Sequence, residues 1–450
     1  MTFSEAKDYL FGLVDYERTP AQVATAAYLN LDRMRELLAR AGDPQRVLRC
    51  VHIAGTKGKG STAAMTARIL RAAGRRVGLY ISPHLIDFRE RMRIDDALIG
   101  EEEFTRLMEE MRPTVEAMRE RGMTPTFFEV CTLVALLWFA RSGVDTAVLE
   151  TGMGGRLDAT NAVEPLATAI TTLALDHTVE LGETLELIAA EKAGIIKPGV
   201  PVVSAPQEAA ATEVIARTAA ARGSSLYRVG GEIRILPGAG PALYGQRFTI
   251  AGRLDVYPDL DCPLLGEHQQ INAAMAVGLA ECLREAGEPI DARAIREGIA
   301  RVEWPGRLQV LRERPLVVLD GAHDPAAMEA LLAALDRHYA GYPRTYLLSF
   351  LREKDWPRML RRLAPGARRF AFAASASPRS VSPDELAAEA MALGVPCITT
   401  PDITTALRTV FDTTPRDEMI VVTGSLYAVG EVLKWWQCGQ WELNTLSNES

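Results

Sequence analysis

At the point that decides its fold, the chain reads Gly55-Thr56-Lys57-Gly58-Lys59-Gly60-Ser61-Thr62. An apolar, β-branched run over residues 47–54 precedes this segment, and an alanine-rich helical pattern over residues 61–73 follows it. A strand, a glycine-rich turn and a helix N-terminus together form an anion site, because small residues let backbone N–H groups approach phosphate oxygens and the helix dipole favours negative charge. The sequence therefore predicts a phosphate-binding loop.

Two side chains of this loop carry the expected chemistry. Lys59 would reach the outer phosphates of a nucleotide, and Ser61 would hold Mg²⁺. The loop departs from the common G-x-x-x-x-G-K-[ST] pattern, since Ile53 stands at its first glycine and Gly60 separates Lys59 from Ser61. These departures argue against an ordinary nucleoside kinase or motor ATPase. Without its flanking strand and helix, the loop would also be compatible with a flexible surface segment.

Around the loop, the patterns predict an α/β protein with a mainly parallel sheet. Strand-like runs alternate with helical patterns, which is typical of a parallel sheet covered on both faces. The strand-like runs span residues 47–54, 77–82, 144–151, 167–173 and 200–204, and the helical patterns span residues 61–73, 101–121, 129–141 and 185–193. Residues 246–265 predict hairpins at the edge of this domain, followed by a helix over residues 267–286.

A second, smaller α/β domain is expected after a hinge at Val302-Glu303-Trp304-Pro305-Gly306-Arg307. Proline fixes its own φ and disfavours helix in the residue before it, while glycine frees the next turn. Strand-like runs recur at residues 316–319, 345–348, 369–373 and 419–422, with helical patterns at residues 326–339, 384–393 and 404–411. We therefore expect domains at residues 1–303 and 304–450.

The composition excludes several classes of protein. A length of 450 residues suggests two to three domains. The net charge of -8 gives no general electrostatic case for a nucleic-acid partner. No stretch reaches the roughly 18–20 apolar residues of a bilayer-spanning helix, and the first residues are acidic where a signal peptide would be basic. The six cysteines form no C-x-x-C pair. We expect a cytoplasmic monomer that binds neither nucleic acid nor membrane.

Several segments resemble the Mur ligase superfamily, and within it the folylpolyglutamate synthase and dihydrofolate synthase family. The loop has the form G-T-x-G-K-G-S, and residues 150–161, E-T-G-M-G-G-R-L-D-A-T-N, are the most family-specific stretch. The resemblance spans residues 31–427 and implies a Mur-ligase-like domain that contains the phosphate loop, followed by a Rossmann-like α/β domain. It departs at Asn30 and Thr151, where the family usually has a glycine and an apolar residue.

The resemblance implies a nucleotide site shared by both domains. Asn272, in G-E-H-Q-Q-I-N, would read adenine through its two-sided amide. Arg307 matches a phosphate-contacting arginine, and Asp320 matches an acid near the ribose. Taken alone, these residues are also compatible with a helix-start Asn, a surface Arg and a turn Asp. The phosphate loop would contribute Gly55, Thr56, Gly58, Lys59, Gly60, Ser61 and Thr62.

By the same resemblance, Ser61, Glu150 and His177 are the Mg²⁺ ligands. Glu150 ends an apolar strand, and ligands bind beyond the carboxyl ends of strands in open α/β sheets. Lys192 would be carbamylated by CO₂, giving an anion that coordinates a second Mg²⁺ or orients a phosphate. Carbamylation needs an uncharged amine, which burial favours by lowering the lysine pKa. Taken alone, His177 is compatible with a structural role and Lys192 with a solvent-facing side chain.

The acceptor is expected along several segments. The resemblance makes Thr126-Phe127-Phe128-Glu129 the pterin-binding segment, although two core aromatics opening a helix would give the same pattern. Ser82, in S-P-H-L, would lie in a mobile loop over the active site, or in a simple strand-ending turn. Further expected acceptor contacts are Leu29, Asp32, Leu157, Asp158 and Ala159. His323 and Ser425 are expected on the glutamate side, and the expected catalytic residues are Lys59, Lys192 and His323.

These features predict an ATP- and Mg²⁺-dependent ligase. ATP would phosphorylate a carboxylate, because oxide is a poor leaving group, and an amine would then displace phosphate to form an amide. Lys59 and Mg²⁺ would neutralise charge on the transferring group, and domain closure about Arg307 would exclude water. The first hypothesis joins L-glutamate to dihydropteroate, to reduced folates, or to both. The alternatives are another Mur-type amide ligase, such as one acting on a peptidoglycan precursor, and a nucleotide-binding regulator without ligase activity.

Overall fold

The first part of the chain is built on an eight-stranded sheet in the order β4-β3-β2-β5-β1-β6-β7-β8. The computed structural model describes residues 1–15, 30–238, 240 and 242–439. From β2 to β8 in this order the strands run parallel, and β3 and β4 continue the sheet antiparallel. The strands are β1 (Arg49–Ala54), β2 (Val77–Tyr80), β3 (Met92–Ile94), β4 (Ala97–Leu98), β5 (Thr146–Glu150), β6 (Pro165–Ile170), β7 (Val202–Ser204) and β8 (Leu226–Arg228).

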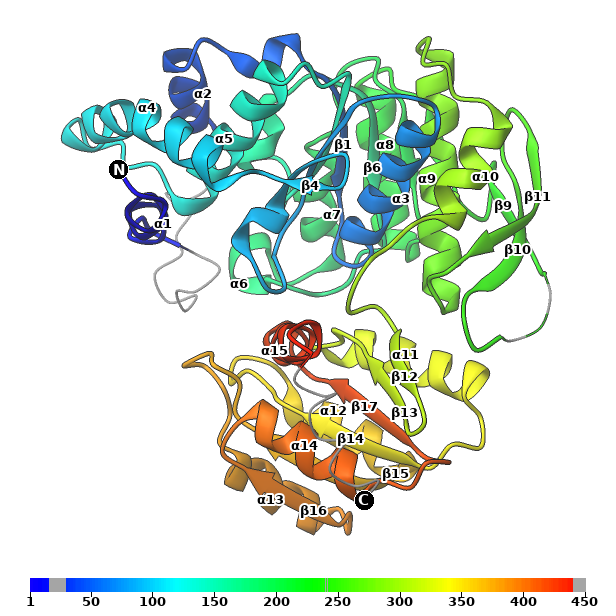
Figure 1. The fold of residues 1–450 in the computed structure, drawn as a ribbon. Coiled ribbons are helices and arrows are strands. Elements are labelled where there is room, and N and C mark those ends of the chain that lie inside the picture. Colours follow the sequence, from blue (N-terminus) through cyan, green and yellow to red (C-terminus); the bar gives the residue numbers. More distant parts are fainter. Residues whose placement is uncertain (16–29, 239, 241, 440–450) are drawn as a thin grey trace.

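Helices cover both faces of this sheet, each over its own apolar core (Figure 1). One core holds α3 (Lys59–Ala72), α9 (Glu267–Glu285) and α10 (Ala292–Ala300). The opposite core holds α1 (Phe3–Phe11), α2 (Leu31–Arg40), α4 (Glu101–Glu120) and α5 (Phe127–Arg141). A smaller core joins α7 (Leu185–Ala193) and α8 (Ala209–Ala221), and the short α6 (Thr178–Leu181) contacts α7. The predicted covering of both faces is therefore observed.

A three-stranded antiparallel sheet, in the order β11-β10-β9, lies beside α9 and α10 (Figure 1). It consists of β9 (Arg234–Leu236), β10 (Gln246–Ala251) and β11 (Val256–Cys262). The β10–β11 pair is the hairpin that the alternating polar and apolar residues predict. The 3-10 segments of this part of the chain are η2 (Pro44–Val47), η3 (Phe88–Arg91) and η4 (Ala159–Ala162).

The second part of the chain forms a separate lobe around a six-stranded sheet in the order β12-β13-β17-β14-β15-β16 (Figure 1). Only β12 is antiparallel to its neighbour. Its strands are β12 (Gln309–Glu313), β13 (Leu316–Leu319), β14 (Arg344–Leu348), β15 (Ala367–Ala373), β16 (Cys397–Thr400) and β17 (Met419–Thr423). Its helices are α11 (Pro325–His338), α12 (Trp356–Leu363), η5 (Ala364–Gly366), α13 (Pro383–Ala392), α14 (Ile403–Thr413) and α15 (Leu426–Gln437).

The two sheets confirm the predicted α/β class. The predicted hinge lies between α10, which ends at Ala300, and β12, which begins at Gln309. The domain boundary between residues 303 and 304 falls inside this linker and stays a prediction. Among the described residues, no helix has the length and apolar character needed to cross a membrane.

The sheet register brings the predicted site together at one edge. Ile53 pairs with Glu150, and Ala54 pairs with Ile170. Beyond these pairs, the phosphate loop, the end of β5 and the segment after β6 leave the sheet on the same side. Because the carboxyl ends of parallel strands meet at one edge, the residues that follow them lie next to one another.

Candidate active site

The phosphate loop is shaped by two residues from distant parts of the chain. Gly58 has a φ of 89°, and a Cβ atom on it would lie 2.2 Å from Asn272 Oδ1. A Cβ atom on Gly60 would lie 2.8 Å from the Trp304 ring. Both glycines are therefore required by close neighbours. The glycine inserted between Lys59 and Ser61 has a structural cause, because the linker tryptophan lies directly against it.

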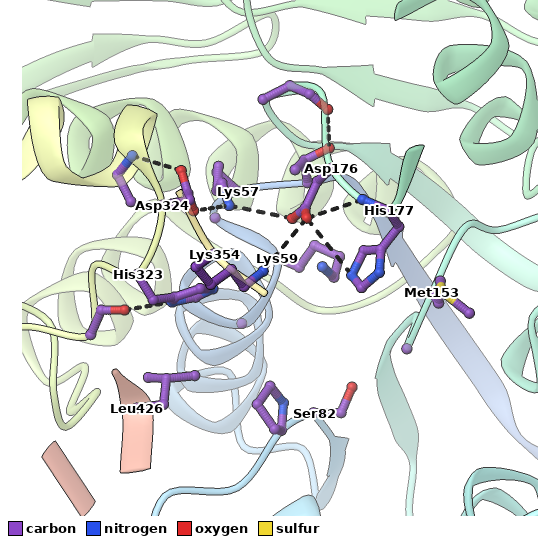
Figure 2. A pocket seen from close by; sticks show the side chains of 18 of the residues that line it. Lys57, Lys59, Ser82, Met153, Asp176, His177, His323, Asp324, Lys354 and Leu426 are labelled. Carbon is purple, nitrogen blue, oxygen red and sulfur yellow. Dashed lines mark hydrogen bonds and ion pairs between the residues drawn. The ribbon is translucent and has the colours of Figure 1, made fainter. Parts of the chain in front are cut away.

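A cavity of roughly 1940 Å³ opens between the two lobes at this loop (Figure 2). It gathers most of the predicted site from both parts of the chain. The predicted residues in its lining are Thr56, Gly58, Lys59, Gly60, Ser61, Ser82, Thr126, Phe127, Phe128, Glu129, Glu150, Leu157, Asp158, Ala159, His177, Asn272, Arg307, Asp320, His323 and Ser425. Outside the lining are Gly55, Thr62, Lys192 and Asp32, and Leu29 is outside the described residues.

Glu150 places a buried carboxylate beside the loop. It is 4% exposed, its Oε1 lies 3.9 Å from Lys59 Nζ, and its Oε2 accepts a 3.3 Å hydrogen bond from the Ser82 N–H. Burial raises the pKa of Glu150 to about 7, although Lys59 opposes this shift. A carboxylate with so little compensating charge fits a site for a hard cation such as Mg²⁺.

His177 lies at the rim of the same cavity. Its backbone is left-handed, with a φ of 51°, and its side chain is half exposed. The imidazole Nε2 is 4.0 Å from Asp176 Oδ1. Within the described ranges, no three His, Cys, Asp or Glu side chains form a metal-binding cluster. The predicted set of Ser61, Glu150 and His177 contains only two side chains of these four types, and it stays a prediction.

Lys192 is buried beneath the loop. It is 4% exposed, and its Nζ donates a 2.8 Å hydrogen bond to the Gly55 carbonyl. Burial, together with the nearby Lys59, lowers the pKa of Lys192 to about 7. Taken alone, the sequence favoured a solvent-facing position for Lys192, but the fold buries this lysine. Carbamylation needs an uncharged amine, and the lowered pKa of Lys192 favours that form near neutral pH.

A network of ion pairs joins the two lobes across the cavity (Figure 2). Lys57 of the phosphate loop pairs with Asp324 of the second lobe, and its Nζ is 3.5 Å from Asp176 Oδ2. Lys354, also of the second lobe, has its Nζ 3.9 Å from Asp176 Oδ1. Burial alone would raise the pKa of Asp176, but Lys57, His177 and Lys354 outweigh it and hold that pKa well below its usual value.

This network was not predicted from the sequence, although one signal pointed toward it. The chain has only seven lysines, since most of its cations are arginine. Four of them, Lys57, Lys59, Lys192 and Lys354, lie at or beneath the cavity.

His323 presents a neutral imidazole to the cavity. Its Nδ1 is 2.7 Å from the Gly321 carbonyl oxygen, so Nδ1 must be the protonated nitrogen. Burial, followed by the charges of Lys57 and Lys354, lowers the pKa of His323 to about 4. The lone pair of Nε2 is therefore available to accept a hydrogen. Asp324, the next residue, caps α11 by accepting a 3.0 Å hydrogen bond from the Ala327 N–H.

The linker residues are tied to the second lobe by Asp320. Its two carboxylate oxygens accept hydrogen bonds from the Leu308 N–H at 2.9 Å and the Ala322 N–H at 2.8 Å. Arg307 directly precedes Leu308, and its Nη1 donates to the Gly306 carbonyl at 3.2 Å. Asp320 therefore fixes the backbone that presents Arg307. Its predicted contact with a ribose remains a prediction.

The two phenylalanines of the predicted acceptor segment, at the start of α5, differ in exposure. Phe128 is partly exposed, and a Cβ atom on Gly152 would lie 2.6 Å from its ring. Phe127 is 1% exposed and packs on Phe11, with ring centroids 5.2 Å apart. Of the two rings, Phe128 therefore offers more surface to a ligand.

Glu129 is held by protein groups. Its carboxylate accepts a 2.8 Å hydrogen bond from the Thr126 N–H and pairs with Arg33 Nε at 2.8 Å. Thr126 in turn accepts from the Glu129 N–H at 3.2 Å, which completes a capping box at the helix start. Asp32 lies beside Arg33, but its side chain is 86% exposed and pairs with Arg35. The predicted substrate contacts of Asp32 and Glu129 remain predictions.

Two families of protein domains match this arrangement. The Mur ligase middle domain matches residues 53–280, and the Mur ligase glutamate ligase domain matches residues 306–426. The chain is 35% identical over 436 residues to the dihydrofolate synthase/folylpolyglutamate synthase of Bacillus subtilis, covering 96% of this chain and 98% of that protein. The fold and the two matches define a Mur-type ligase.

Solved structures agree with this class. Mycobacterium tuberculosis folylpolyglutamate synthase complexed with ADP and AMPPCP is 33% identical, with a TM-score of 0.83 over 90% of this chain and 95% of that one. Escherichia coli FolC in complex with DHPP and ADP is 29% identical, with a TM-score of 0.85 over 98% of this chain and 99% of that one. This chain belongs to the folylpolyglutamate synthase and dihydrofolate synthase family of Mur ligases. The predicted family and the predicted class of ATP-dependent glutamate ligase are confirmed.

Proposed function

We propose that this protein uses ATP and Mg²⁺ to add L-glutamate to dihydropteroate, to reduced folates, or to both. One observation carries the proposal: a single cavity is lined by Lys59, the buried Glu150 and the partly exposed Phe128. These residues supply a phosphate-binding cation, a carboxylate suited to a metal and an aromatic face. The nucleotides and DHPP in the solved structures of relatives support the same combination.

The first step is phosphoryl transfer to the acceptor carboxylate. A carboxylate oxygen bonds to the γ-phosphorus of ATP, the bond to the bridging oxygen breaks, and ADP leaves. Lys59 and the loop N–H groups bind the phosphates and offset their charge. Mg²⁺, held by Ser61, Glu150 and His177, would supply further charge neutralisation. Lys192 sits beneath the loop, where a carbamate on its amine would orient a phosphate or a second Mg²⁺.

The second step forms the amide. The glutamate amine attacks the acyl carbon, and phosphate leaves with the electrons of the broken bond. His323 lines the cavity, and its unprotonated Nε2 would accept a proton from that amine. Ser425, at the start of α15, would contact glutamate from the second lobe. Closure of the lobes about Arg307 would keep water from the acyl phosphate.

The proposal also covers the domain boundary, the oligomeric state and the location in the cell. We place the domain boundary between residues 303 and 304 and expect a cytoplasmic monomer. Size-exclusion chromatography with light scattering tests the oligomeric state. Limited proteolysis tests the boundary, because the linker should be cut before either sheet.

A substrate panel tests the function. Purified protein is incubated with ATP, Mg²⁺ and glutamate, and with dihydropteroate, a reduced folate, a peptidoglycan precursor or no acceptor. We expect ADP release with a product one glutamate heavier for dihydropteroate, for the reduced folate, or for both. ADP release only with a peptidoglycan-type acceptor would favour another Mur-type ligase. No ADP release with any acceptor would favour a regulatory nucleotide-binding protein.

A further inference from the structure

A chain of buried hydrogen bonds connects the strand beneath the phosphate loop to the acceptor pocket. His52, in β1, is fully buried, and its Nε2 lies 2.8 Å from Thr160 Oγ1. Thr160 Oγ1 lies 2.5 Å from Asp158 Oδ1. Asp158 lines the cavity, whereas His52 and Thr160 do not. The site as described so far gives His52 no role.

The hydrogen count sets the direction of this chain. Asp158 Oδ1 accepts the Thr160 N–H at 3.0 Å, Oδ2 accepts the Met153 N–H at 2.9 Å, and the Thr160 hydroxyl donates to Oδ1. The single hydroxyl hydrogen of Thr160 then points to Asp158, and the Thr160 oxygen must accept from His52. His52 therefore carries its hydrogen on Nε2.

The other ring nitrogen agrees with this assignment. His52 Nδ1 has no hydrogen-bond partner among the described residues, as expected for an unprotonated nitrogen. Burial, with a smaller contribution from Lys197, lowers the pKa of His52 to about 3. The imidazole is therefore neutral at physiological pH, with a hydrogen on Nε2 and, at Nδ1, a lone pair that accepts no hydrogen bond from the described residues.

His52 faces away from the core that supports the phosphate loop. Side chains alternate along a strand, and Val51 and Ile53 belong to the core that holds α3. Cys50 points to the opposite core, which holds α5, and His52 shares that side of the strand. Its hydrogen bond consequently leads to the acceptor end of the cavity.

We propose that His52 is a positioning residue that, through Thr160, aims the Asp158 carboxylate into the acceptor pocket. The inference rests on the proposed function, because it assumes that a pterin-type ring binds beside Asp158 and Phe128. Asp158 also holds Met153, which follows Gly152 directly beneath the Phe128 ring. The Asp158 carboxylate thus has two roles: it is the polar group offered to the ligand, and it holds the backbone against which the Phe128 ring packs. A fixed carboxylate suits a ligand that presents neighbouring N–H donors.

Steady-state kinetics test this role by measuring KM for dihydropteroate and KM for ATP separately. His52→Leu and Thr160→Val each remove one link, and Thr160→Val keeps the side-chain shape. We expect KM for dihydropteroate to rise about tenfold, the effect of losing one hydrogen bond to a charged group, while KM for ATP stays within about twofold. His52→Gln keeps an N–H donor and should recover most of the loss. Equal changes in both KM values would overturn the proposal.

Thr146→Val is the matched control. Thr146 is fully buried in the neighbouring strand β5, and its hydroxyl has no hydrogen-bond partner among the described residues. Removing this hydroxyl should leave KM for dihydropteroate unchanged. A tenfold rise in this control would show that any buried hydroxyl in the sheet has the same effect, and the proposed chain would be refuted.

A spectroscopic experiment decides the direction without turnover. ¹⁵N NMR of histidine-labelled protein should show a neutral His52 with its hydrogen on Nε2, and Thr160→Val should shift that resonance. A hydrogen on Nδ1 would overturn the proposal. If the wild-type protein accepts neither dihydropteroate nor a folate, the proposed function fails. Turnover by the wild type with an unchanged KM in His52→Leu and Thr160→Val would refute the positioning role alone.

Discussion

Different interactions fix the residues at the two ends of the cavity. At the phosphate end, charged groups reach across from both lobes: Lys57 pairs with Asp324, and Lys354 lies near Asp176. At the acceptor end, the supports of Phe128 and Asp158 come from the first lobe alone, through packing and buried hydrogen bonds. Single partly exposed ion pairs are weak, whereas buried contacts are strong. We therefore expect the proposed acceptor pocket to be preformed, and the proposed nucleotide site to be complete only when the lobes lie together.

The largest expected effect is at the phosphate end. Lys59→Ala should lower ADP formation by roughly 10³-fold, because it removes the positive charge proposed to stabilise the transferring phosphoryl group. Thermal unfolding should be close to that of the wild type. Lys7→Ala, an exposed lysine on α1, is the control and should retain full activity. Wild-type turnover by Lys59→Ala would remove the phosphate loop from the mechanism.

Glu150→Gln should change stability in a pH-dependent way. The folded-state pKa of Glu150, about 7, lies above the ordinary glutamate value of 4.5, so folding favours the protonated form. The fold therefore loses stability as pH rises from 4.5 through about 7, by roughly 3 kcal/mol in all. Without Mg²⁺, the variant should be more stable than the wild type at about pH 8, and similar to it below pH 4.5.

Urea unfolding with EDTA or with Mg²⁺ measures this effect. Mg²⁺ should stabilise the wild type more than the variant, because a ligand stabilises the state that binds it. An equal Mg²⁺ response in both proteins would exclude Glu150 as a metal ligand. A stability difference that does not depend on pH would contradict the raised pKa.

Phe128→Ala should act on the acceptor end alone. Loss of one stacking face is expected to weaken dihydropteroate binding about tenfold to a hundredfold, with ATP affinity little changed. Isothermal titration of each ligand measures both values. Unchanged dihydropteroate binding would argue against the pocket, and a parallel loss of ATP affinity would break the contrast between the two ends.

The smallest effect is expected for the pair that crosses the cavity. Lys57→Ala and Asp324→Asn, with the double variant, form a cycle whose coupling energy should stay below about 1 kcal/mol. The readout is KM for ATP at low and at high salt, and the coupling should shrink as salt screens the charges. A coupling that appears instead in KM for dihydropteroate would show that the acceptor end also depends on the second lobe.

Local patterns predicted the elements that carry the chemistry. The segment β1, loop and α3 lies within two residues of its predicted bounds, because an apolar run and a glycine-rich turn mark it clearly. The helix expected from residue 129 begins instead at Phe127, since Thr126 caps it. Short strands such as β3 (Met92–Ile94) and β4 (Ala97–Leu98) were not predicted, because two or three residues carry too little periodicity.

The sequence by itself determined the anion-binding loop, the parallel α/β class and the family, because each follows from spacing and periodicity along the chain. The loop needs one strand, one turn and one helix, the class needs the alternation of several such elements, and the family needs the motifs over residues 31–427. Only the tertiary structure decided the charge states. Lys192 has a pKa of about 7 because distant segments bury it, and Lys57 meets Asp324 across 267 positions of sequence. Desolvation and long-range pairing depend on which remote residues arrive at a site, and no local pattern encodes that arrival.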